Sequence, residues 1–158
     1  MVEQKRSHMK NLALLVFSAA VAAVFFVFHR LVSPTAWLGV GLAVGSLWYI
    51  LDPLVLFPRY TKFSELPFPL SRSFWLLLIF WPLALFILTS TGSSLAQGMM
   101  VALGLGIGIE LVSDISQPDV IKTAFHFPSA SKWNATELQI LSGGWLVGLI
   151  ILITLFVI

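Results

Sequence analysis

The chain has 158 residues, of which 58% are hydrophobic and only 10% are charged, whereas soluble domains carry about 25% charged residues. This composition excludes an ordinary water-soluble domain. Because the chain contains no cysteine, disulfides, thiolate nucleophiles, iron–sulfur clusters and cysteine-based zinc sites are also excluded. The net charge of +2 lies beside apolar stretches rather than in one basic patch, so we expect no nucleic-acid partner.

Five apolar stretches follow one another along the chain. We predict one all-α domain over residues 1–158, a bundle of five transmembrane helices at about 11–28, 35–57, 73–90, 95–112 and 136–158. At about 1.5 Å per residue, each stretch is long enough to cross most of the ~30 Å hydrocarbon core of a bilayer.

Local signals mark where several of these helices begin or end. Ser33 followed by Pro34 is typical of a helix start, because serine caps a helix and proline suits its first turn. Asp52 followed by Pro53 predicts a bend or a helix end, since the residue before a proline is pushed away from helical geometry. The segment from Asn134 to Glu137 matches a capping box, which predicts the start of the last helix.

The basic residues beside the apolar stretches fall almost entirely in alternate connections. They are Lys5, Arg6 and Lys10 before the first stretch, Arg59, Lys62 and Arg72 between the second and third, and Lys122 and Lys132 between the fourth and fifth. Only Arg30 breaks the alternation. Because basic residues near span ends are retained on the cytoplasmic side, we predict a cytoplasmic N-terminus and an outside C-terminus. We expect a multi-pass protein of the cell membrane, of the bacterial inner-membrane type.

The segment at about 118–126 has an amphipathic pattern. Val120, Ile121, Ala124 and Phe125 share one helical face, opposite Asp119, Lys122 and His126. We therefore predict one interfacial helix, half sunk in the inner headgroup layer.

Pairs of glycines at four-residue spacing occur in three of the predicted spans. They are Gly41 with Gly45, Gly104 with Gly108, and Gly144 with Gly148. Such pairs let helix backbones approach closely in lipid, so we predict packing seams there. A seam could lie within one chain or between two copies of it.

The acidic residues are the main candidates for chemistry. Asp52, Glu110 and Asp114 fall at the cytoplasmic ends of their predicted spans, and His126 lies on the adjoining interfacial segment. Carboxylates and an imidazole at one depth could hold a metal ion or relay protons. The alternative is that these residues have no chemical role and are ordinary charges at helix ends in the headgroup layer of the membrane.

The favoured functional hypothesis is a small scaffold, accessory or assembly subunit without catalysis. It needs no cofactor, and its partners are the lipid bilayer and either another membrane protein or a second copy of the chain. One alternative is a transporter or permease component in which Asp52 and Glu110 couple protons or cations. A further alternative is a membrane-embedded, metal-dependent hydrolase that uses the polar cluster of Asp52, Glu110, Asp114 and His126.

Overall fold

The structure, a computed structural model, describes residues 2–29, 33–56, 69–127 and 133–157. This part of the chain is all-α, as predicted, and contains no strand. Its six α-helices are α1 (Val2–His29), α2 (Ser33–Leu51), α4 (Phe74–Phe86), α5 (Ser94–Ser113), α6 (Pro118–Ala124) and α7 (Ala135–Val157). Three short turns join them: the π-helical turns η1 (Asp52–Leu56) and η3 (Ile87–Thr91), and the 3₁₀ turn η2 (Leu70–Arg72).

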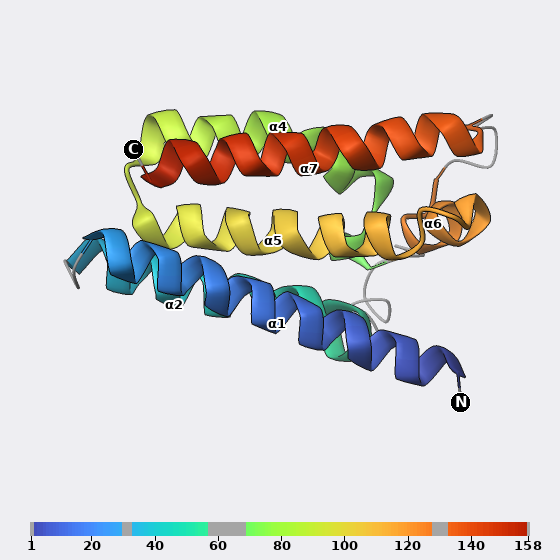
Figure 1. Cartoon of the computed structure of the whole chain (residues 1–158), viewed down its shortest axis with the longest axis horizontal. Helices are drawn as coiled ribbons and strands as arrows, with labels where there is room; N and C mark the ends of the chain where they lie inside the picture. Colours follow the sequence, from blue (N-terminus) through green and yellow to red (C-terminus); the bar gives the residue numbers. More distant parts are fainter. Residues whose placement is uncertain (1, 30–32, 57–68, 128–132, 158) are drawn as a thin grey trace.

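Helix α5 is the axis of the bundle. In Figure 1 it runs between the pair α1 and α2 on one side and the pair α4 and α7 on the other. Helices α1, α2, α4, α5 and α7 all run along the long axis of the bundle, and the two ends of the chain lie at opposite ends of it (Figure 1). Helix α6 lies at the same end as the N-terminus, and we call this the N-terminal end of the bundle.

Three helical segments of the described chain are long and apolar enough to cross a membrane. They are Ala36–Val55, Ser94–Ser113 and Ala135–Leu155. Two shorter apolar segments, Met9–Val24 and Phe74–Ser90, correspond to the other two predicted spans. Together these helices indicate a multi-pass membrane protein that contacts the lipid bilayer.

Helix α1 begins earlier than the predicted span. It starts at Val2 and passes without a break through the basic segment that includes Lys10. The segment is rich in Glu, Gln, Lys, Arg and Met, which are good helix formers, so the backbone stays helical where the apolar pattern has not yet begun. As a result Lys10 is fixed on a helix.

The predicted helix boundaries at Pro53 and Asn134 are confirmed. Helix α2 ends at Leu51 and continues as the π-helical turn η1, because a proline removes one backbone donor and displaces the carbonyl four residues earlier. Before α7, the Glu137 amide donates to the Asn134 side chain at 2.9 Å, and the Asn134 amide donates to Glu137 Oε2 at 2.8 Å. These reciprocal bonds are the predicted capping box.

Helix α6 is present, but its apolar face is covered by the protein itself. The helix ends at Ala124, two residues before the predicted end, and His126 has a left-handed backbone with φ 49°. Ile121 and Phe125 are each 1% exposed and pack in the same core cluster as Leu138. The face that was predicted to enter the headgroup layer therefore closes the N-terminal end of the bundle.

Glycines bring the backbones of α2 and α5 into direct contact. A side chain at Gly41 would overlap the carbonyl oxygen of Leu95, and one at Gly98 would overlap the carbonyl oxygen of Leu38. A Cβ at Gly45 would lie 2.8 Å from both the Met99 carbonyl oxygen and Ala102 Cβ. In lipid, where water does not drive helices together, such close approach supplies dispersion contacts.

The other glycine pairs meet side chains or open space. A Cβ at Gly104 would lie 2.5 Å from Leu149 Cδ2, and one at Gly108 would lie 3.3 Å from Leu149 Cδ1. Gly148 is covered by the ring of Trp81, whereas nothing lies within 4 Å of a Cβ at Gly144.

Helices α1 and α2 are joined by a buried hydrogen bond of 2.8 Å between the hydroxyls of Ser18 and Ser46.

We predict that Gly41→Ala destabilises the protein by about 1–3 kcal/mol, because the added methyl group forces the backbones of α2 and α5 apart. The matched control is Gly39→Ala on the same helix, where a Cβ meets nothing within 4 Å. Alanine favours the helix by up to about 1 kcal/mol, so the control should be neutral or stabilising. Unfolding by dodecyl sulfate in detergent micelles, followed by circular dichroism, measures both. Equal stability of the two variants would contradict the close α2–α5 contact.

Candidate functional site

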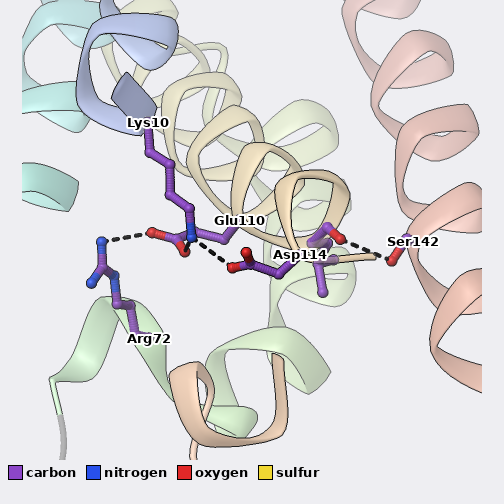
Figure 2. A network of polar contacts seen from close by, with 6 residues as sticks. Lys10, Arg72, Glu110, Asp114 and Ser142 are labelled. Atoms are coloured by element: carbon purple, nitrogen blue, oxygen red, sulfur yellow. Dashed lines mark hydrogen bonds and ion pairs between the residues drawn. The ribbon is translucent and has the colours of Figure 1, made fainter. Parts of the chain in front are cut away.

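Four charged side chains form a network at the N-terminal end of the bundle. The Lys10 ammonium donates to Glu110 Oε2 at 2.8 Å and to Asp114 Oδ2 at 2.6 Å. On the other side of Glu110, Arg72 Nη2 donates to Oε1 at 2.6 Å. Figure 2 shows the ammonium between the two carboxylates, with Arg72 approaching Glu110 from the opposite side. We call Lys10, Arg72, Glu110 and Asp114 the charge network.

Helix geometry explains how two of its members share one cation. Glu110 and Asp114 are four residues apart at the end of α5, so their side chains lie on the same face one turn apart. On α1, Lys10 is followed at the same spacing by Leu14 and Ser18, which are 2% and 6% exposed. The face of α1 that packs into the bundle therefore carries Lys10 at its N-terminal end.

The third carboxylate, Asp52, holds the segment that carries Arg72. Asp52 is 1% exposed in the π-helical turn after α2, and its Oδ2 accepts a bond of 2.6 Å from the Ser71 amide. The next residue is Arg72, whose guanidinium lies 5.8 Å from the ring centroid of Tyr49 on α2. The aromatic face attracts the cation, and Asp52 fixes the backbone beside it. Both contacts position Arg72 toward Glu110.

Helix α7 is tied to the same end of α5 through a hydroxyl. Close to Asp114 the helical hydrogen-bond pattern changes, and the Ile115 amide donates to the Val112 carbonyl rather than to that of Leu111. Ser142 donates to its own helix at the Leu138 carbonyl, at 2.8 Å, and lies 3.5 Å from the Leu111 carbonyl oxygen (Figure 2). Because the hydroxyl has one proton and the Leu138 carbonyl is closer, the contact of Ser142 with Leu111 across the two helices is the weaker one.

The charge network is buried and electrically balanced. Glu110 and Asp114 are 4% and 1% exposed, and their partners Lys10 and Arg72 are 14% and 24% exposed. Two half-buried cations therefore face two buried carboxylates. A buried charge without its partner costs several kcal/mol, so these four groups depend on one another.

The structure places the residues of the predicted polar cluster as follows. Glu110 and Asp114 share the Lys10 ammonium, Asp52 accepts from the Ser71 amide, and His126 is an exposed residue after α6. Within residues 2–29, 33–56, 69–127 and 133–157, no three His, Asp or Glu side chains form a group that could hold a metal ion. The metal site stays a prediction, and a lysine ammonium takes the place between Glu110 and Asp114 where a cation was expected.

Sequence reasoning missed the two cations of the network. Lys10 and Arg72 were assigned to topology, as charges that stay at the cytoplasmic surface. Lys10 could have been found from its i, i+4, i+8 relation to Leu14 and Ser18, but the uniformly apolar stretch hides which face is buried. Arg72 meets Glu110 from 38 residues away, and no local pattern in the sequence points to that contact.

No protein-family model, no curated protein and no solved structure matches this chain. The functional argument therefore depends on the geometry of the chain itself. That geometry defines an all-α, multi-pass membrane protein whose polar side chains at one end are paired with each other.

We predict that Lys10→Met lowers the free energy of unfolding by about 3–5 kcal/mol, since it leaves buried carboxylates without their cation. The double variant with Asp114→Asn should recover part of this loss, because the remaining carboxylate, Glu110, keeps Arg72 as its partner. The matched control is Lys122→Met: its 3.8 Å pair with Asp119 lies in water, with Asp119 97% exposed, and should matter much less. Unfolding in detergent micelles measures all three variants. A Lys10→Met protein as stable as the unchanged chain would contradict a stabilising network.

Proposed function

We propose that this chain is a five-span protein of the cell membrane, with its N-terminus inside, that acts as a non-catalytic scaffold or accessory subunit. In this proposal α1 and α4 cross the bilayer together with the three long apolar helices. The chain offers its partners a rigid bundle whose sides are apolar and whose inner end is closed by paired charges.

The opposite placement of the two chain ends supports the five-span topology (Figure 1). The charge network and α6 lie together at the N-terminal end, where basic residues are retained on the cytoplasmic side. The C-terminal end carries the uncharged turn around Gly92, between η3 and α5. This polarity follows the positive-inside rule.

The observation that carries the scaffold proposal is the pairing of the carboxylates with donors on other segments. Glu110 receives two cations from segments far away in sequence, and Asp52 accepts from a backbone amide. A carboxylate that couples proton or cation transport must exchange its partner for the transported ion. Donors fixed on other helices favour a structural role, because each partner released would loosen the bundle.

The exposed faces of α4 and α7 are suited to lipid or to a partner helix. Large apolar side chains point outward along both helices, including Trp75, Ile79, Ile140, Val147 and Ile150. In water such a surface would cause aggregation, whereas in a bilayer it is the normal lipid-facing surface. A partner subunit could replace lipid on these faces without disturbing the charge network.

The predicted topology can be tested with single cysteines, because the chain has none of its own. Ser90 in η3 and Ser116 just after α5 are both exposed, and these two segments lie at opposite ends of the bundle (Figure 1). We expect an impermeant maleimide to label Ser90→Cys in intact cells and Ser116→Cys only after the membrane is opened. Labelling of both positions from the outside would refute the proposed orientation.

The scaffold function can be separated from transport by reconstitution. We expect the purified chain to give liposomes no proton or cation flux above that of Glu110→Gln, and to migrate in native gels of solubilised host membranes as part of a larger complex. Flux that is lost in Glu110→Gln, but kept in the surface variant Glu137→Gln, would favour transport. Migration as a monomer without any flux would contradict both the scaffold function and the transport function.

A further inference from the structure

A hydrophobic groove opens on one side of the bundle, between α1 and α7. Its volume is about 270 Å³. Ala13 and Phe17 of α1 form one wall, Leu146 and Leu149 of α7 form the other, and Gly108 lies in the floor on α5. Figure 1 shows α5 between these two helices. Gly108 has no side chain to fill the space, so the groove persists between two helices that both pack on α5.

The dimensions of the groove favour a single flexible chain as its occupant. Its floor follows α5 from Leu105 to Ser113, a rise of about 12 Å. Spread over this length, its volume leaves the centre of a water-sized sphere a width of about 5 Å, so the walls are about 8 Å apart, whereas a helix with its side chains is about 10 Å across. A partner helix cannot enter, but one hydrocarbon chain can. In a bilayer, the hydrocarbon chain in greatest supply is the acyl chain of a lipid.

The N-terminal end of the groove has a different chemistry. Ser113 is the polar residue of its lining, at the last position of α5. The backbone of α1 continues as a helix for two turns before Lys10, on the side of the bundle where Lys10 meets the end of α5. Lys10 is already paired with Glu110 and Asp114, and the sequence before it carries Lys5 and Arg6 against the one acidic residue Glu3.

We propose that the groove binds one acyl chain of an anionic phospholipid from the inner leaflet, with the phosphate beside Ser113 and the basic first turns of α1. The apolar part of the site holds the chain, and the excess of basic residues selects a negative headgroup. The proposal rests on the cytoplasmic position of the N-terminus. It adds a specific lipid as a ligand of the scaffold.

The test is native mass spectrometry of the purified full-length chain in detergent, with equal amounts of dioleoylphosphatidylglycerol and dioleoylphosphatidylcholine. We expect one phosphatidylglycerol to be retained in preference to phosphatidylcholine. Two variants fill the groove from opposite walls, Ala13→Trp and Leu146→Trp, and both should lose the lipid. The control Ala19→Trp adds the same ring on an exposed part of α1 outside the groove and should keep it.

The headgroup is tested by Arg6→Gln, which should weaken the preference for phosphatidylglycerol by about fivefold, the effect of one basic residue near a membrane surface. Lipid retained by both groove-filling variants would overturn the site, and equal retention of phosphatidylcholine would overturn the anionic ligand. A dimer that disappears in Ala13→Trp would mean that a second copy covers the groove, which also overturns the proposal. Maleimide labelling of Ser90→Cys and Ser116→Cys does not depend on lipid retention, so it reports failure of the topology separately.

Discussion

The carboxylate of Glu110 lies at the end of an apolar helix and is 4% exposed, so it is stable only with positive partners close by. Lys10 and Arg72 are these partners, and they come from segments 100 and 38 residues away. Their contacts bring the start of α1 and the start of α4 to the same end of α5. Asp114 balances the second positive charge. One electrostatic requirement thus determines how three parts of the chain meet.

The packing of the other helices depends on the positions in α5 that have no side chain. Its glycines leave the backbone open, so α2 approaches at Gly98, and Phe80 and Leu149 fill the space beside Gly104. Trp145 of α7 donates to the Gly104 carbonyl at 3.0 Å, a bond that the bare backbone allows. In lipid, close contact and interhelical hydrogen bonds replace the hydrophobic effect as the forces between helices. The helix with the smallest side chains therefore has the most neighbours.

The charge network and the glycines of α5 give the end and the sides of the bundle different properties. The N-terminal end is closed by paired charges and by the apolar face of α6, whereas the sides remain apolar and partly grooved. Where α5 has a glycine and its neighbours diverge, at Gly108, an open groove is left between α1 and α7. A protein built in this way is suited to holding lipid or another helix at its sides while its own fold stays fixed. The four charged side chains of its network are paired with one another.

The sequence by itself determined the all-α class, the apolar helices, the end of α2 at Pro53 and the cap before α7, because these depend on local composition and on residues within one turn. It also indicated that Glu110 and Asp114 act together, since four-residue spacing puts both on one face. Only the tertiary structure decided their partners. An ion pair between Lys10 and Glu110 leaves no periodic signal, and uniformly apolar helices do not reveal which face is buried. The same reason hid the groove beside Gly108, whereas the apolar face of α6 was visible in the sequence and only the helices that cover it were not.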